Sequence, residues 1–231
     1  MAEIIPAILE KDYEDLKDKI ALVRGVVPIV QIDFCDGIFV PTRTWPFSSG
    51  GGADEHLGRI LSEEEGMPFW EDIDFEFDLM VADAVENFNI YTKLGPKRII
   101  FHIEAVGELE SFHHFLEGID MYVRDSIEIG VAINPSTPSE QIFPIISSID
   151  FVQCMGNDKI GHKGMLLDEQ VYKKIVILRE KYPDLPIAVD IGVNETTAPL
   201  LIERGATKLV AGSAIFKTDD IIGTIEEFES L

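Results

Sequence analysis

Short apolar runs alternate along the whole chain with segments in which apolar residues recur every three or four positions. One such segment places Tyr13, Leu16, Ile20 and Val23 on a single helix face. Alternation of strands and helices is typical of a parallel sheet. Eight strands are predicted, at Ile4–Leu9, Ile29–Phe34, Phe75–Val81, Arg98–Ile103, Gly130–Asn134, Phe151–Met155, Ile187–Asp190 and Lys208–Ala211.

Eight strands and about as many helices in 231 residues predict an α/β fold of the (β/α)8 or TIM-barrel type. No internal repeat and no linker divides the chain, so residues 1–231 are expected to form a single domain. A doubly wound open sheet is the structural alternative, because it shows the same alternation of elements.

The stretch Thr42–Asp72 interrupts this rhythm after the second strand and predicts an elongated loop there. It holds Trp45, Phe47 and the glycines Gly50–Gly52. Long loops in compact domains often act as lids, and this composition fits a mobile flap that covers an active site with apolar side chains. A surface loop or an oligomer contact explains the same composition equally well.

Polar residues stand at or near the ends of several predicted strands, where a parallel barrel assembles its active site. Alternation along the second and third strands directs Gln31, Asp33 and Asp78 into the barrel, and Asp190 ends the seventh strand. Carboxylates that meet in one cavity repel each other unless a cation or shared protons relieve them. The sequence therefore predicts a divalent metal site or a proton-transfer pair, with helix capping or lysine pairing as the structural alternative.

Composition limits the binding partners and the cellular compartment that can be expected for the protein. The formal net charge of −23 disfavours nucleic acids and anionic membranes as partners. No long apolar segment suggests a membrane span or a signal peptide. Cys35 and Cys154 fall in different predicted strands, so we expect no disulfide and a cytoplasmic location.

Seven motifs follow one another along the chain, at Ile5–Leu9, Asp33–Pro41, Asp78–Val81, Phe101–Ala105, Asn134–Pro138, Val189–Val193 and Ala211–Phe216. In this order they give the chain a resemblance to the ribulose-phosphate 3-epimerase family, within the ribulose-phosphate-binding barrels, as a divergent member. The resemblance covers nearly the full length, although the Thr42–Asp72 region is longer than usual in the family.

The resemblance implies a cytoplasmic isomerase of carbohydrate metabolism, in the pentose phosphate pathway. Such an epimerase interconverts D-ribulose 5-phosphate and D-xylulose 5-phosphate, and family members often form homo-oligomers. Two aspartates, here Asp33 and Asp190, would move the C3 proton through an enediolate. The substrate, a small phosphorylated sugar, would contact five further residues, namely Met80, Met155, Gly192, Gly212 and Ser213.

The family resemblance also implies a metal held by Gln31, Asp33, Asp78 and Asp190. The family has histidines at the positions of Gln31 and Asp78, so the set here offers only oxygen. Oxygen ligands favour Mg²⁺ or Mn²⁺ over Zn²⁺ or Fe²⁺. Either the metal has changed or the site has none. His102 is retained in the resemblance but is not a metal ligand in the family, and we expect it to pack beside the site.

Other departures from the family leave the activity open. Ala7 and Ile191 replace a serine and a glycine, and the loop after the sixth strand carries Lys159, His162 and Lys163. These basic residues form either a new anion grip or an ordinary solvated loop. Three functions are compatible with the sequence: an active epimerase, a catalytically altered or inactive sugar-phosphate-binding barrel, and an enzyme with the same proton chemistry on another substrate.

Overall fold

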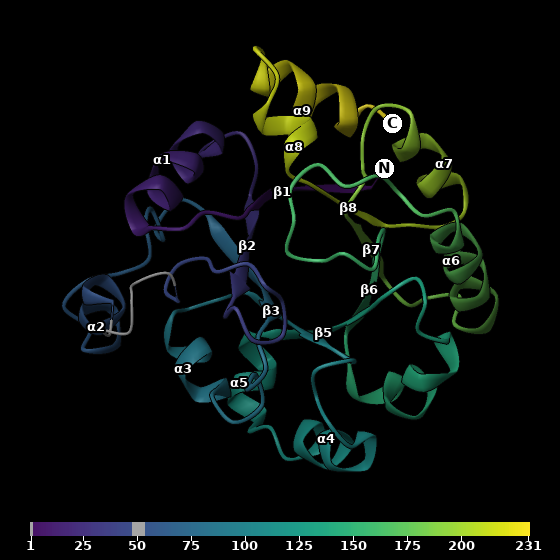
Figure 1. The fold of residues 1–231 in the computed structure, drawn as a ribbon, viewed down its shortest axis with the longest axis horizontal. Helices are drawn as coiled ribbons and strands as arrows, with labels where there is room; N and C mark the ends of the chain where they lie inside the picture. Colours follow the sequence, from purple (N-terminus) through teal and green to yellow (C-terminus); the bar gives the residue numbers. More distant parts are fainter. Residues whose placement is uncertain (1, 48–53) are drawn as a thin grey trace.

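A computed structural model describes residues 2–47 and 54–231 of the protein. In these residues eight parallel strands follow one another around a closed barrel, and β8 pairs with β1 (Figure 1). Closure excludes the open doubly wound sheet and confirms the predicted (β/α)8 barrel. The strands are β1 (Glu3–Ile8), β2 (Ile29–Cys35), β3 (Asp74–Met80), β4 (Arg98–His102), β5 (Glu128–Ile133), β6 (Phe151–Met155), β7 (Ile187–Asp190) and β8 (Lys208–Ala211).

Helices surround the barrel (Figure 1). Their buried apolar residues belong to the large core cluster that covers the outside of the strands. The predicted stripe on α1 is confirmed, because Leu16, Ile20 and Val23 are all buried. The helices are α1 (Tyr13–Val23), α2 (Glu55–Leu61), α3 (Phe88–Lys93), α4 (Leu109–Glu117), α5 (Met121–Ser126), the 3₁₀ helix η1 (Ser139–Ser148), α6 (Gln170–Lys181), α7 (Thr197–Glu203), α8 (Ser213–Phe216) and α9 (Ile221–Glu229). None of them combines the length and the apolar composition that crossing a membrane requires.

Alternation along each strand divides the core into two parts. In β2, Val30, Ile32 and Phe34 belong to the large apolar cluster that the helices cover, whereas Cys35 belongs to a smaller cluster inside the barrel. Cys35 and Cys154 are both buried free thiols, as expected. Most strands contribute apolar side chains to this interior cluster, so the polar side chains inside the barrel are exceptions.

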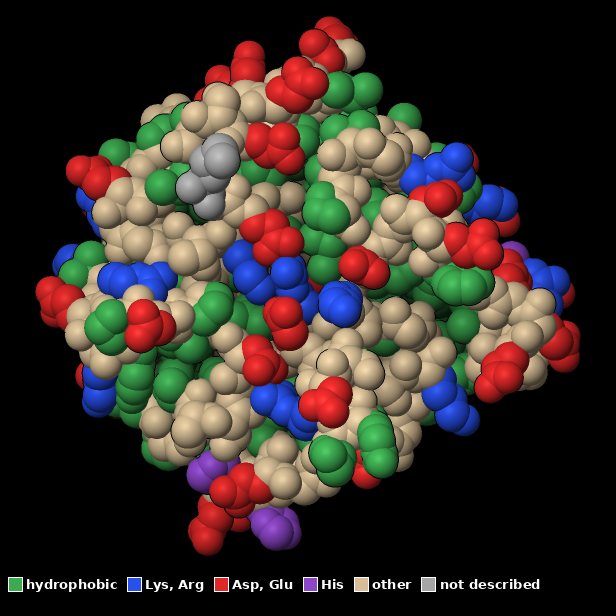
Figure 2. Space-filling model, turned by 180° about the vertical axis from the view of Figure 1, so that it is seen from behind, with side chains coloured by type: hydrophobic (Ala, Val, Ile, Leu, Met, Phe, Trp, Pro, Cys, Tyr) green, Lys and Arg blue, Asp and Glu red, His purple; other side chains and the backbone are tan. Residues whose placement is uncertain are grey.

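The face on which the strands begin is closed by ion pairs. Arg98, the first residue of β4, contacts the carboxylates of Glu3, Glu76 and Glu128 at 3.1 to 3.3 Å. Lys208 lies 3.7 Å from the same Glu128 carboxylate. Figure 2 shows acidic and basic side chains together at the middle of this face. The bottom of the barrel is therefore plugged, and its interior opens at the opposite rim.

The Thr42–Asp72 region differs from the expected flap. It contains helix α2, and Trp45 is only 1% exposed, with its ring 5.9 Å from that of Phe34 and 5.5 Å from that of Tyr13. The indole Nε1 also donates a 2.9 Å hydrogen bond to Asp54. The prediction that Trp45 covers the active site is wrong, because its large apolar ring gains more by filling the core between α1 and β2. Gly50–Gly52 lie outside the described residues.

Candidate active site

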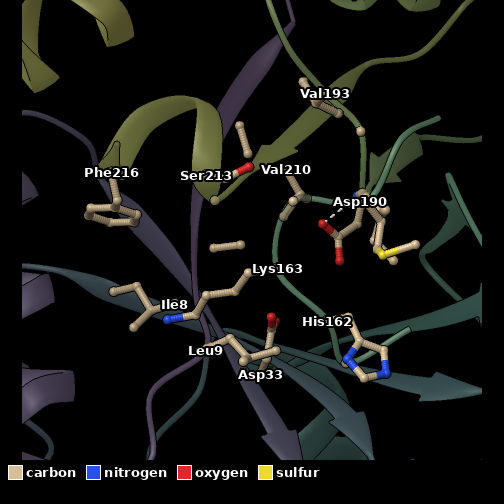
Figure 3. A pocket seen from close by; sticks show the side chains of 18 of the residues that line it. Ile8, Leu9, Asp33, His162, Lys163, Asp190, Val193, Val210, Ser213 and Phe216 are labelled. Atoms are coloured by element: carbon tan, nitrogen blue, oxygen red, sulfur yellow. Dashed lines mark hydrogen bonds between the residues drawn. The ribbon is translucent and has the colours of Figure 1, made fainter. Parts of the chain in front are cut away.

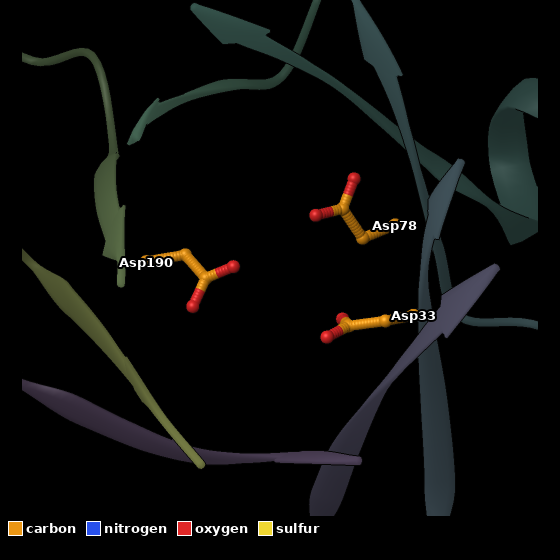
Figure 4. Close-up of side chains that lie close together, drawn as sticks. All are labelled: Asp33, Asp78 and Asp190. Atoms are coloured by element: carbon orange, nitrogen blue, oxygen red, sulfur yellow. The ribbon is translucent and has the colours of Figure 1, made fainter. Parts of the chain in front are cut away.

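Three aspartates meet inside the barrel near the rim where the strands end. Asp33 on β2 pairs in register with Asp78 on the neighbouring β3, and Asp190 ends β7. One carboxylate oxygen from each lies within 4.8 Å of the others, and all three residues are buried. Figure 4 shows the carboxyl groups pointing toward one another, with Asp190 facing the other two across the cavity. The geometry brings together three of the four residues predicted as metal ligands.

The fourth, Gln31, lies beside this triad but presents its nitrogen. Its Nε2 donates to Asp33 Oδ1 at 2.8 Å and to Asp190 Oδ2 at 3.3 Å. The backbone N–H of Ile191 donates to the other oxygen of Asp190 at 2.7 Å. The Gln31 amide therefore links Asp33 on β2 to Asp190 on β7, across the cavity.

Asp78 is held by two further buried side chains. His102 Nε2 lies 2.7 Å from Asp78 Oδ1, and Gln153 Nε2 donates to Oδ2 at 3.2 Å. His102 packs beside the triad, as expected from the sequence. Gln153 was not among the predicted site residues. The same alternation rule would have found it, because it faces inward between Phe151 and Met155 on β6.

Burial and crowding raise the pKa values of Asp33 and Asp190. Burial, together with the charges of Asp190 and Asp78, raises the pKa of Asp33 well above its usual value. Burial and the Asp78 charge raise the pKa of Asp190 to about 7. For His102, burial alone would lower the pKa, but the Asp78 carboxylate outweighs it and the pKa is raised. The site therefore holds carboxyl groups that can exchange protons near neutral pH.

A pocket leads from Asp33 and Asp190 to the surface. Figure 3 shows both carboxyl groups among the side chains that line it, together with those of Lys163, His162 and Ser213. Residues Gly161–Met165 of the loop after β6 form one wall, and the end of β1 forms another. Lys163 spans these walls with a 2.8 Å ion pair to Glu10. The cover is therefore supplied by the loop after β6 rather than by Trp45.

The outer end of the pocket contains the residues predicted to bind phosphate. Gly192, Gly212 and Ser213 all line it, and Lys19 and Lys217 stand at its edge. Gly192 has φ of +78°, and a Cβ there would lie 2.5 Å from the backbone nitrogen of Leu167, so this turn requires glycine.

The remaining predicted residues differ in their distance from the pocket. Met80 lines it, whereas Met155 is fully buried in the interior cluster beside it. Of the three basic residues after β6, His162 and Lys163 line the pocket, and Lys159 lies in a neighbouring surface depression. Ile191 adopts φ of +73°, which is unusual for a β-branched residue. The family resemblance suggested a glycine at this position, and this is the backbone conformation that glycine adopts most readily.

The three carboxylates could hold a divalent metal. Oxygen atoms within 4.8 Å of one another can all contact one hard cation, which binds oxygen at about 2.0 to 2.6 Å. Two or three negative charges in a buried space also need a cation, shared protons or donors to relieve their repulsion. The arrangement defines a barrel enzyme with proton-transfer groups at the inner end of a pocket and polar loops at its mouth.

Comparison with known proteins agrees with this description. The family model described as the ribulose-phosphate 3 epimerase family matches residues 3–216, so the chain belongs to that family. The ribulose-phosphate 3-epimerase of Bacillus subtilis (strain 168) is 30% identical, with 98% of each chain covered. The cytoplasmic isoform of ribulose-phosphate 3-epimerase from Oryza sativa subsp. japonica is 28% identical, over 93% of this chain and 87% of its own.

A solved structure of KGPDC from Streptococcus mutans superposes with a TM-score of 0.70 at 14% identity, covering 99% of this chain and 96% of its own. At that identity the likeness supports the barrel fold alone. Epimerases are isomerases, and the family match therefore identifies the chain as an isomerase of the sugar-phosphate epimerase kind.

Proposed function

We propose that the protein is an active epimerase that interconverts D-ribulose 5-phosphate and D-xylulose 5-phosphate. One observation carries the proposal: Asp33 and Asp190 face the same pocket from β2 and β7, on opposite sides of the barrel. Inversion at a carbon next to a carbonyl requires a base on one face of the substrate and an acid on the other. The relatives named above as ribulose-phosphate 3-epimerases supply the substrate pair.

In this mechanism one aspartate, as the carboxylate, takes the proton from C3 and leaves an enediolate. The other aspartate, as the neutral acid, gives its proton to the opposite face of the same carbon. The reverse reaction exchanges the two roles. The pKa of Asp190, raised to about 7 by burial and the Asp78 charge, suits this task, because a group with a pKa near neutrality can both accept and donate.

The pocket orients the sugar between these groups. Backbone N–H groups at Gly192, Gly212 and Ser213 would bind the phosphate at the outer end, where Lys19 and Lys217 add positive charge. Met80 would lie against the carbon chain, and Met155 would support it from below. Loop Gly161–Met165 lines the same pocket and would lie over the bound sugar.

Asp33, Asp78 and Asp190 would hold a metal ion, and we propose Mg²⁺ or Mn²⁺, because three carboxylates are hard ligands. When bound, the ion supplies positive charge where negative charge develops on the enediolate oxygen. We also propose a cytoplasmic location, supported by the two free buried cysteines and by the rice relative named a cytoplasmic isoform. A homo-oligomer is proposed on family resemblance.

The test is hydrogen exchange at C3. The purified protein is incubated with ribulose 5-phosphate in deuterated water, once after chelation and once with added Mn²⁺, and NMR follows C3. We expect deuterium at C3 and the appearance of xylulose 5-phosphate. Binding of the sugar phosphate without any exchange, in both samples, would instead establish the inactive sugar-phosphate-binding barrel. Elemental analysis of the same preparation identifies the metal that it carries.

A further inference from the structure

Gln31 lies at the centre of the barrel, between the two aspartates that the proposed reaction uses. It is fully buried, and its Oε1 has no hydrogen-bond partner among the described residues. Its Nε2 contacts Asp33 Oδ1 at 2.8 Å and Asp190 Oδ2 at 3.3 Å. An amide nitrogen carries two hydrogens, so it can donate one to each carboxylate.

The orientation of this amide follows from its neighbours. Rotating it by half a turn would place Oε1 against two carboxylate oxygens, and wherever both carboxyl groups are ionised three acceptors would then face one another without a hydrogen between them. A buried acceptor cluster of that kind is costly unless a cation enters it. A neutral amide, in contrast, keeps both donors at every pH and does not compete for the protons that the aspartates exchange.

We propose that Gln31 is a positioning residue that bridges Asp33 and Asp190, rather than a metal ligand. The bridge holds the two carboxyl groups at a fixed separation on either side of the substrate, whether or not a cation is bound. A metal in the site is then held by the three carboxylates alone. The role in catalysis rests on the proposed function; the bridge itself does not.

The first test detects the hydrogen bonds of the bridge by NMR and does not depend on enzymatic activity. NMR spectra are recorded on metal-free, ¹⁵N-labelled wild type and on Gln31→Met, a variant of similar shape without a donor. The side-chain NH₂ signals that are absent from the spectrum of the variant are assigned to Gln31. Because both hydrogens bond to buried carboxylates, we expect exchange with deuterated water at least 100-fold slower than for exposed glutamines. We also expect these signals to shift in Asp190→Ala. Exchange as fast as at the surface would overturn the bridge.

The second test separates a bridge from a ligand. Mn²⁺ is titrated into metal-free wild type and Gln31→Met by calorimetry, with Asp78→Asn as the variant that loses a ligand. A bridge predicts that Gln31→Met binds Mn²⁺ within about twofold of wild type or more tightly. An affinity loss of tenfold or more, like that expected for Asp78→Asn, would overturn the proposal. If wild type binds no Mn²⁺, Gln31 is no ligand and the NMR experiment decides the bridge.

The third test measures the positioning role. Removing a hydrogen bond to a charged group corresponds to about a 10- to 100-fold loss of rate. We expect a loss of this size in the kcat of Gln31→Met for C3 exchange, with KM within about twofold of wild type. Gln153→Met is the matched control, because Gln153 is equally buried and has a similarly unpartnered Oε1 within the described chain. Its Nε2 donates to Asp78 Oδ2 and to Met155 Sδ, and so takes no part in the bridge between Asp33 and Asp190.

We expect Gln153→Met to lower kcat at least threefold less than Gln31→Met does, because it leaves the bridge intact. Equal losses in the two variants would overturn the positioning role. Gln31→Glu, of the same shape, provides a second variant, and it should lose at least as much activity because it replaces the donating amide with a fourth carboxyl group. Absence of exchange in wild type would reject the proposed function, whereas the NMR experiment would still decide the bridge.

Discussion

His102 Nε2 lies 2.7 Å from Asp78 Oδ1, and both side chains are completely buried. This contact explains how the barrel tolerates a buried aspartate at a position where the family resemblance suggested a histidine. Asp78 is not left as an uncompensated charge, because His102 on the adjacent β4 and Gln153 on β6 each supply a donor. The three residues form a network that adjoins the Asp33–Gln31–Asp190 bridge.

Removing the imidazole should destabilise the fold strongly. His102→Leu leaves a buried carboxylate without its charged partner, and breaking such a pair costs about 3 to 5 kcal/mol. We expect a loss of that order in the free energy of unfolding, measured in urea at pH 7. His113→Leu is the control, because His113 on half-exposed α4 contacts only Ser148 Oγ and Glu117 among the described residues. A loss below about 1 kcal/mol for His102→Leu would contradict this account.

Asp190→Asn should abolish C3 exchange without weakening phosphate binding. The amide can neither take nor deliver the proton, and loss of a general acid–base group lowers rates by about 10²- to 10⁴-fold. The substitution leaves unchanged the residues that we propose bind phosphate, Gly192, Gly212 and Ser213, so the binding of an unreactive phosphate ligand should change by less than about threefold. Retained exchange above one tenth of wild type would remove Asp190 from the mechanism.

Stability should fall as pH rises from about 5 to 7. The pKa of Asp190 is raised to about 7 by burial and the Asp78 charge, and burial raises that of Glu76 to about 7 as well. Over this window the unfolded chain has already lost protons that the folded chain retains, so rising pH favours unfolding. Each such group contributes on the order of 1.4 kcal/mol per pH unit.

Urea unfolding at pH 5, 6 and 7 measures this slope in metal-free protein. Asp190→Asn, which carries no titrating proton at that position, should have a shallower slope than wild type. Mn²⁺ should restore stability more at pH 7 than at pH 5, because it binds the ionised carboxylates. A stability that rises toward pH 7 without metal would contradict the raised pKa values.

Lys163 should contribute to substrate binding rather than to the chemical step. Its ammonium group reaches into the pocket and pairs with Glu10 at 2.8 Å, and its side chain is about half exposed. Exposed charges contribute weakly, so we expect Lys163→Ala to raise KM about two- to fivefold while kcat stays within about twofold. Lys159→Ala, in the same loop but outside this pocket, should change neither. Equal effects of the two variants would assign the loop a general electrostatic role instead.

The sequence alone predicts which side chains of a strand point into the barrel, because alternation along that strand determines their orientation. The pattern in β2 predicted that Gln31 and Asp33 point inward, and the pattern in β3 predicted the same for Asp78; the structure confirms both orientations. The helical spacing of α1 likewise identified its buried face. These features depend on neighbours within one element, and the period of a strand or helix fixes them.

Features that join distant elements were not accessible in this way. One of the two interpretations of the Thr42–Asp72 region made Trp45 a cover for the site. Instead, the indole is buried against Tyr13 and Phe34, whose positions the closed barrel sets. The family resemblance suggested Gln31 as a metal ligand, whereas its nitrogen faces the aspartates. That orientation depends on which acceptors β7 brings within 3.3 Å.

The sequence by itself therefore determined the barrel and the carboxylates that enter it, because strand period and element order are local properties. Tertiary structure decided which donors meet those carboxylates, among them His102, Gln153 and the Gln31 amide. The physical reason is that a hydrogen bond acts within about 3.5 Å, and only closure of the barrel brings residues from β2, β4, β6 and β7 to that distance.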